Sequence, residues 1–180
     1  MNSEGISVRE LQKKDIEPLS NYWLNADAGY MRGMGVDVSK LPTREEWNKM
    51  LTEQLSQDYK NKKSYAIIWE LDGEAIGHSN INKIIFGEEA YMHLHLWNNT
   101  LRKKGIGTAL VKLTLPYYFK NFGLKKLYVE PYALNPAPVK TLERAGFTFL
   151  RKYTCVPGFI CFEQEVSLWE LSREDFERNL

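Results

Sequence analysis

The sequence predicts a mixed α/β fold, with a single central, mostly antiparallel sheet of about seven strands and helices on both faces. Runs with the two-residue period of strands alternate with runs at helical spacing. Turn signals at Asp72-Gly73 and Pro157-Gly158 join neighbouring strands as antiparallel pairs. The chain has 180 residues, of which 43% are hydrophobic, enough for one core. We therefore expect residues 1–180 to form a single domain.

The charge balance excludes several classes of partner. There are 24 Lys and Arg residues against 23 Asp and Glu residues, so the net charge is +1 and gives no attraction of the whole chain to nucleic acid or an anionic membrane. No apolar run is long enough to span a membrane, and the first residues lack the core of a signal peptide. We expect a cytoplasmic protein without nucleic-acid or membrane partners.

The first third of the chain predicts one strand and two helices. Residues 6–10 alternate as a short strand, and Asp15 stands where the N-cap of a helix would. Thr43 and Glu46 form a capping box at the start of the second helix. Residues 25–42 contain three glycines and show no clear period, so we expect a long, mobile connection.

The middle and the end of the chain predict six further strands and two helices. The helix that starts near Gly105 contains Pro116, which predicts a kink or a local break. Gly123 and Gly146 follow the two helices at the positions that favour glycine. The expected strands span residues 65–69, 75–81, 90–97, 127–129, 147–153 and 160–171, and the expected helices span residues 105–122 and 135–144.

The two cysteines, Cys155 and Cys161, flank the predicted turn at Pro157-Gly158. A cross-strand disulfide is conceivable if the two strands place them opposite each other. Two free thiols in a reducing cytoplasm are the better interpretation. Neither the cysteine spacing nor the histidine content suggests a zinc site, so we expect no metal.

The segment from Leu94 to Val111 carries the clearest chemical signal. A strand ends, a short loop follows, and a long helix begins, so several backbone N–H groups at the helix start point toward one place. Gly105 and Gly107 allow an oxyanion to approach the backbone closely. The pattern favours a phosphate or pyrophosphate ligand, whereas the structural alternative is a capped helix start with solvated lysines. The Walker motif and the three-glycine dinucleotide fingerprint are absent. The loop carries three cations, Arg102, Lys103 and Lys104.

Three segments of the chain, in order, resemble the GNAT superfamily of N-acetyltransferases. Arg102-x-x-Gly105-x-Gly107 after a strand resembles the acetyl-CoA loop of that superfamily. The run from Asn135 to Gly146-Phe147 resembles its second signature. The front of the chain, from Trp23 to Trp47, resembles the ribosomal-protein-alanine and spermidine acetyltransferase-like branch, so the resemblance covers nearly the whole chain.

The resemblance implies that the sheet splays into a V between the strand ending near Trp97 and the strand at Leu127–Glu130. The pantetheine arm of acetyl-CoA, the cosubstrate, would lie in this V and pair with the strand edge near Leu96 and Trp97. Asn135 would help to hold the pantetheine or thiol end. The pyrophosphate would bind the loop and the start of the helix, with Arg102 beside it. These positions are Lys103, Lys104, Gly105, Ile106, Gly107 and Thr108.

Two positions depart from the family pattern. Leu142 stands where many members carry the tyrosine that protonates the leaving thiolate, and Pro138 stands where this branch often has serine. Solvent, an ordered water near Asn135, or Tyr132 would then supply the proton. The need is modest, because the pKa of a thiol is about 8.5.

The attacking amine needs a base. His93, His95 and Trp97 share one strand face by alternation, and His95 lies about 7 Å along the strand from Trp97. We therefore predict His95, or else His93, as the base, directly or through water, and Asn135 as the third site residue. Hydrogen-bonded core histidines are the structural alternative. The remaining histidine, at position 78, is interpreted as structural or surface, and weaker candidates for the base are Glu88, Glu89 and Glu130.

The sequence thus predicts an enzyme that moves the acetyl group of acetyl-CoA to a primary amine by direct attack in a ternary complex. Neither cysteine falls near the motif, so no covalent acyl-enzyme is implied. The alternative is a non-catalytic sensor or regulatory module that binds CoA. The acceptor would be an amine-bearing small molecule or a protein N-terminus, weakly attracted by Asp27 and Asp37, and the protein a monomer or homodimer.

Overall fold

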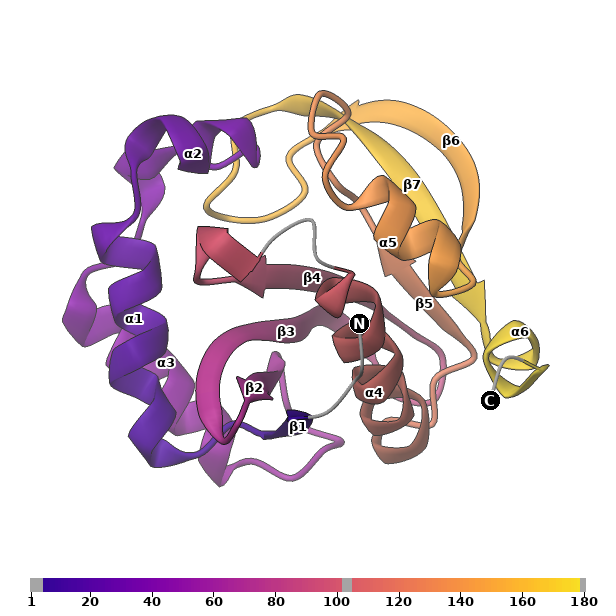
Figure 1. Cartoon of the computed structure of the whole chain (residues 1–180), viewed down its shortest axis with the longest axis horizontal. Helices are drawn as coiled ribbons and strands as arrows, with labels where there is room; N and C mark the ends of the chain where they lie inside the picture. The colour runs from indigo at the N-terminus through magenta and orange to yellow at the C-terminus, as the bar shows by residue number, and fades with distance from the viewer. Residues whose placement is uncertain (1–4, 102–104, 179–180) are drawn as a thin grey trace.

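A computed structural model of the chain describes residues 5–101 and 105–178, without the side chain at position 99, and confirms the predicted fold class. The described strands form one sheet, and the helices cover both of its faces (Figure 1). The strands are β1 (Ile6–Glu10), β2 (Tyr65–Leu71), β3 (Glu74–Ile85), β4 (Glu89–Leu96), β5 (Lys126–Val129), β6 (Thr148–Cys155) and β7 (Gln164–Ser172). The α-helices are α1 (Ile16–Asn25), α2 (Ala28–Gly33), α3 (Arg44–Ser56), α4 (Ile106–Asn121), α5 (Val139–Arg144) and α6 (Arg173–Arg178).

The strand order is β1-β2-β3-β4-β5-β7-β6, and only β4 and β5 run parallel. Figure 1 shows α1, α2 and α3 together on one side of the sheet, with α4 and α5 on the other. The two faces therefore have separate cores. Strand β2 contributes Ile67 and Trp69 to the α4 side and Ala66 and Ile68 to the α1–α3 side. A strand buried on both faces needs a continuous apolar run, which explains why this strand shows no alternation.

The sheet opens at its centre, as predicted. Strands β4 and β5 pair only through Glu89–Lys126, Ala90–Leu127 and Tyr91–Tyr128. The β4–β5 register ends at Tyr91–Tyr128, whereas β4 itself continues to Leu96. The carboxyl-terminal half of β4 therefore forms one side of a fork whose closed end lies at Tyr91.

The connection between α1 and α3 is more ordered than predicted. It contains α2 and a 3-10 helix at Val38–Lys40, and it buries Met31 and Val36 in the core of that face. Asp27 starts α2 by accepting a hydrogen bond of 2.8 Å from the backbone N–H of Tyr30. The prediction of a long, mobile connection was wrong, because helices this short span too few residues to show a period.

Prolines affect two of the predicted helices, one of which begins later than predicted. Helix α5 begins at Val139 rather than near Asn135, because prolines at 136 and 138 disfavour a helical conformation at the residues before them. Helix α4 continues through Pro116 without a local break. The carbonyl that loses its N–H partner there belongs to Lys112, which is exposed and so can bond water.

The chain end differs from prediction in two respects. Strand β7 starts at Gln164 instead of near 160, and residues 173–178 form the unpredicted α6. Across the β6–β7 pair, Cys155 lies opposite Gln164, whereas Cys161 forms an isolated bridge with Val36. The cysteines are thus not opposite each other, and both are free thiols as expected.

Candidate active site

The start of α4 has the backbone geometry expected of an anion site. Gly105, the residue before the helix, has φ = 79°, a left-handed conformation that favours glycine. Among the described side chains, a Cβ built on Gly107 would approach only the Thr141 hydroxyl, at 3.7 Å, so they leave open space beside this backbone. The first N–H groups of a helix lack partners within the helix and favour an oxyanion. The predicted residues Arg102, Lys103 and Lys104 lie outside the described residues.

The half of β4 beyond Tyr91 turns one backbone edge toward the fork. The N–H of Trp97 donates to the carbonyl of Ile76 in β3, at 2.9 Å. Because backbone groups alternate along a strand, the N–H and C=O groups of Leu94 and Leu96 face the β5 side. This is the edge along which the resemblance places the pantetheine arm.

Asn135 lies on the opposite side of the fork, in the turn between β5 and α5. Its Oδ1 accepts a hydrogen bond of 3.1 Å from the N–H of Ala137, and its own N–H donates to the carbonyl of Tyr132. The side chain therefore shapes the turn that enters α5, and its Nδ2 donates to none of the described residues.

The position of the missing family tyrosine is closed to solvent. Leu142 is fully buried in the α4-side core, so it contributes packing only. Pro138 is the N-cap residue of α5. Tyr132 is half-buried, forms an isolated bridge with Val166, and meets Phe162 edge-on at 5.6 Å between ring centroids.

The other face of β4 carries a cluster of aromatic and imidazole rings. His95 stacks on His78 of β3 at 4.7 Å between ring centroids, and Trp23 of α1 meets His95 edge-on at the same distance. The Tyr22 hydroxyl lies 3.2 Å from Nδ1 of His95, and the Tyr30 hydroxyl lies 3.2 Å from that of Tyr22. Residues of α1, β3 and β4 therefore meet at the ring of His95, and Tyr30 of α2 is linked to it through Tyr22.

The other two histidines are held neutral. The indole N–H of Trp97 donates to Nδ1 of His78 at 2.8 Å, and burial, with a smaller effect of His93, lowers the pKa of His78 to about 3. His78 is structural, as predicted. Burial, together with the charge of Lys83, lowers the pKa of His93 to about 4, and its Nε2 donates to Oδ1 of Asn82 at 3.1 Å. His93 is therefore a weak base whose Nε2 is already engaged.

The three glutamates considered as alternative bases lie away from this cluster. Glu130 is buried, accepts a hydrogen bond from the Tyr153 hydroxyl, and pairs with Lys83 at 3.2 Å. Glu88 is exposed and pairs with Lys125 at 2.7 Å. Glu89 lies at the closed end of the fork, where β4 and β5 are still paired.

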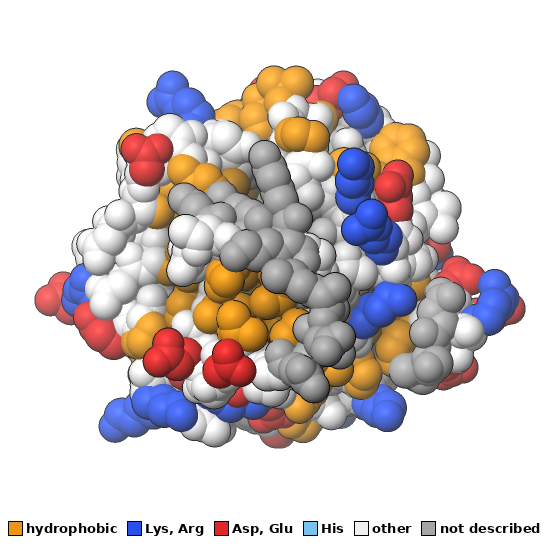
Figure 2. Space-filling view, in the orientation of Figure 1, with side chains coloured by type: hydrophobic (Ala, Val, Ile, Leu, Met, Phe, Trp, Pro, Cys, Tyr) orange, Lys and Arg blue, Asp and Glu red, His pale blue; other side chains and the backbone are white. Residues whose placement is uncertain are grey.

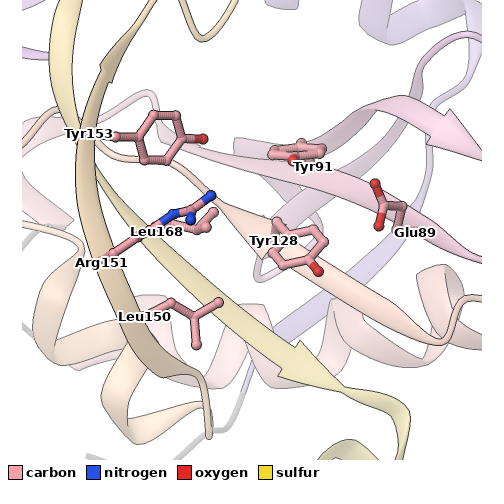
Figure 3. A pocket seen from close by; sticks show the side chains of 7 residues that line it. All are labelled: Glu89, Tyr91, Tyr128, Leu150, Arg151, Tyr153 and Leu168. Carbon is pink, nitrogen blue, oxygen red and sulfur yellow. The ribbon is translucent and has the colours of Figure 1, made fainter.

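A hollow of about 340 Å³ opens near that closed end (Figure 3). In the figure, the guanidinium of Arg151 points into the space between Tyr153, Tyr91 and Tyr128. Of the candidates for the base, only Glu89 lines this hollow. The lining residues are Glu89, Tyr91, Tyr128, Leu150, Arg151, Tyr153 and Leu168.

Other groups predicted near the site have local roles. Asp27 caps α2, and Asp37 accepts hydrogen bonds from Ser39, which lower its pKa. Burial raises the pKa of both thiols, those of Cys155 and Cys161, so at neutral pH they are protonated and poor nucleophiles. Among the described residues, no group of three or more His, Cys, Asp or Glu could hold a metal, and no helix is long and apolar enough to cross a membrane.

The surface around the fork is mixed. On the face shown in Figure 2, hydrophobic side chains gather near the centre, and Lys and Arg side chains form a row on the side of α4 and α5. A basic row beside the start of α4 suits an anionic ligand, although it is far smaller than the basic stripe of a nucleic-acid-binding protein.

Sequence reasoning did not identify Tyr22. It precedes Trp23, a core residue of α1, and lies 73 positions before the histidine it contacts. No local motif links residues so far apart, so only the packing of α1 on the sheet reveals the pair.

Comparison with known proteins gives the family. The model of the acetyltransferase (GNAT) domain matches residues 6–148. A search of curated protein sequences gave no match.

Solved structures give the same fold. Spermidine N-acetyltransferase from Vibrio cholerae, in complex with CoA and spermine, is similar with a TM-score of 0.78, 17% identity, and coverage of 98% of this chain and 99% of that one. RimL, the ribosomal L7/L12 α-N-protein acetyltransferase in complex with CoA, has a TM-score of 0.76, 14% identity, and coverage of 94% and 95%. Aminoglycoside acetyltransferase AAC(6')-Ib, with CoA and kanamycin, has a TM-score of 0.74, 18% identity, and coverage of 96% and 98%.

The family match, together with the fork in the sheet and the glycine-bearing start of α4, confirms the predicted family and enzyme class. Because the matched residues make up most of the sequence, the chain belongs to the GNAT acetyltransferase family, and it is an acetyl-CoA-dependent N-acetyltransferase of that family.

Proposed function

We propose that this enzyme, one domain over residues 1–180, binds acetyl-CoA in the fork between β4 and β5 and transfers its acetyl group directly to a primary amine. The observation that carries the proposal is the end of β4–β5 pairing at Tyr91–Tyr128, while β4 runs on to Leu96 beside the start of α4. This arrangement offers a strand edge for the amides of the pantetheine arm and helix N–H groups for the pyrophosphate.

In this proposal the cosubstrate is held mainly by backbone groups. The pyrophosphate lies on residues 103–108, with the cations of Arg102 to Lys104 adding attraction. The pantetheine arm pairs with the strand edge at Leu94 and Leu96 rather than with the predicted Trp97, whose backbone N–H is bonded to Ile76 of β3. Asn135 donates from Nδ2 to the pantetheine or thiol end. The three CoA-bound structures of the same fold support a coenzyme site here.

The amine would arrive on the α1–α2 side of β4, where His95 accepts its proton. The neutral nitrogen then attacks the thioester carbonyl carbon and becomes positively charged in the tetrahedral intermediate. That nitrogen loses its surplus proton to water, and the intermediate collapses to the amide as the CoA thiolate leaves. With Leu142 buried in the core, the thiolate takes its proton from water or from Tyr132. The protonated, partly buried thiols of Cys155 and Cys161 favour direct transfer over an acyl-enzyme.

The acceptor class is an amine-bearing small molecule or a protein N-terminus. The structural neighbours act on or bind spermidine or spermine, kanamycin and the N-terminus of ribosomal L7/L12, which defines a rational panel. Asp27 and Asp37 are engaged in local caps, so the attraction that they offer to a polycation is weak.

The test is release of the CoA thiol from acetyl-CoA across a panel of spermidine, kanamycin, single amino acids and short peptides with free N-termini. The expected result is amine-dependent release with one class, with mass spectrometry showing acetate on the amine. CoA binding without amine-dependent release under any condition would instead support the sensor or regulatory module.

A further inference from the structure

A chain of three hydrogen-bonding side chains leads from β4 toward the surface. The Tyr30 hydroxyl lies 3.2 Å from the Tyr22 hydroxyl, which lies 3.2 Å from Nδ1 of His95. The same Tyr22 hydroxyl lies 3.8 Å from the sulfur of Met34. Tyr22, Tyr30 and His95 are all half-buried, so the chain joins the ring cluster to the outside of α2.

The ring of His95 has little freedom to turn. It is stacked on His78 with an interplanar angle of 24°, and Trp23 packs against it edge-on at 65°. Its orientation therefore keeps Nδ1 directed toward Tyr22. A neutral imidazole carries one proton, so a donor Nδ1 makes Nε2 the nitrogen that accepts.

We propose that Tyr22 is a positioning residue for His95: its oxygen accepts the Nδ1 proton, so that Nε2 takes the proton of the acceptor amine, and the Tyr22–Tyr30 pair then passes a proton outward. This inference rests on the proposed function, since it assumes that His95 is the base.

The proton transfer balances at every step. When Nε2 binds the amine proton, the ring carries a positive charge and both nitrogens hold protons. Nδ1 gives its proton to the Tyr22 oxygen, Tyr22 gives its own to the Tyr30 oxygen, and Tyr30 gives its own to water. The ring is then neutral with its proton on Nε2, and each tyrosine again holds one proton. Transfer of the Nε2 proton to the departing CoA thiolate or to water, and return of a proton from water through Tyr30 and Tyr22 to Nδ1, restore the starting tautomer.

The companion histidine cannot serve in this way. Nδ1 of His78 accepts from the Trp97 indole, and its pKa of about 3 keeps it neutral at physiological pH. A neutral ring beneath His95 also adds no like charge when His95 is protonated. Titratable groups of the described residues that face His95 include His78 from β3, Tyr22 from α1 and, through Tyr22, Tyr30 from α2.

The first experiment compares Tyr22→Phe with Tyr117→Phe. Tyr117 donates to the carbonyl of Val8 on the α4 side, so its variant removes a hydroxyl of similar burial away from the ring cluster. We expect Tyr22→Phe to lower kcat roughly tenfold, less than the ~10²–10⁴ of a whole general base, with little change in KM for acetyl-CoA. Tyr117→Phe should leave both unchanged.

Two further readouts separate positioning from a merely structural role. In Tyr22→Phe, the acidic limb of the pH profile of kcat should move to lower pH, because the charged ring loses the acceptor of its Nδ1 proton. In a His95→Ala background, Tyr22→Phe should cost nothing more. An equal loss in both backgrounds, or an unchanged kcat and profile in Tyr22→Phe, would overturn the inference.

A spectroscopic test does not depend on turnover. The chain has three histidines, so ¹⁵N-histidine spectra can be assigned with single variants. Tyr22→Phe should change the ring ¹⁵N shifts of His95 and leave those of His78 unchanged. Unchanged His95 shifts would refute the contact itself. Altered His95 shifts in an enzyme that acetylates no amine would refute the proposed function while upholding the Tyr22 contact.

Discussion

The two sides of β4 are built on different principles. Toward α4, the strand presents Ala90 and Met92, both fully buried, and the features that suit a ligand are backbone groups of the strand edge and the helix start. Toward α1 and α2, it presents His93 and His95 in a cluster of hydrogen-bonded side chains. In the proposed function, the α4 side would bind its ligand through backbone groups, whereas the α1–α2 side would depend on the identity of its side chains.

This difference predicts how each side responds to substitution. A backbone site fails when a side chain blocks it and tolerates the loss of single charges. A side-chain site fails when one functional group is removed. The variants below, ordered by expected effect, test that contrast.

The largest effect is expected from Gly107→Val. The added side chain would occupy the space beside the helix start, where the nearest described side-chain atom is the Thr141 hydroxyl, at 3.7 Å. The fold should therefore survive while CoA affinity falls roughly a hundredfold or more. Calorimetric titration with CoA measures the loss. Gly158→Val is the matched control, since its nearest atom, the Cys161 sulfur, also lies at 3.7 Å. Tight CoA binding by a folded Gly107→Val protein would show that the phosphate site does not lie at the start of α4.

The next largest effect is expected from His95→Ala, which should lower kcat by roughly one to three orders of magnitude with little change in acetyl-CoA affinity. The loss should shrink as pH rises, since more of the amine is then already neutral. His93→Ala should cost less, because the pKa of His93 is lowered to about 4. The pH dependence of kcat for the three proteins is the measurement. A folded His95→Ala enzyme with intact turnover at pH 7 would show that His95 is not the base and that its ring has a structural role.

A smaller effect is expected from Asn135→Ala. The substitution removes both the predicted Nδ2 donor and the hydrogen bond from Ala137 that shapes the turn. Turnover or CoA affinity should fall more than in Lys140→Ala, an exposed change on the adjacent helix. Steady-state kinetics of the two variants measure these losses. Equal, small losses would mean that Asn135 only shapes the turn.

Single replacement of Arg102, Lys103 or Lys104 should cost about tenfold or less in CoA affinity, because exposed charges are screened. The losses should diminish further at high salt. Titrations at two ionic strengths test this, and a hundredfold loss from one cation would mean that a side chain dominates the site.

No loss of activity is expected from the Cys155→Ser/Cys161→Ser double variant. Both thiols have raised pKa values through burial, and neither belongs to the predicted site. Turnover should match the wild type in a steady-state assay. Ping-pong kinetics, or an acetylated cysteine found by mass spectrometry, would contradict direct transfer.

The same contrast explains what could be predicted from the sequence. The loop from Arg102 to Thr108 is contiguous, and its chemistry follows from glycine and helix geometry, so a short pattern indicates it. The strand pattern likewise placed His95 and Trp97 on one face. The partner of His95 could not be found this way, because Tyr22 reaches it only through the packing of α1 and α2. Helix α2 spans too few residues to show a helical period, so the sequence was interpreted as a loose connection there.

The Lys83–Glu130 ion pair affects the energetics of the fork. Lys83 reaches from β3 over the ring of Tyr91, at 4.5 Å from its centroid, to the carboxylate that directly follows β5. It therefore ties the strands on either side of β4 together where their pairing ends. If the width of the fork is fixed before a ligand binds, binding does not have to order the two strands. Less conformational entropy is then lost, and more of the contact energy contributes to affinity.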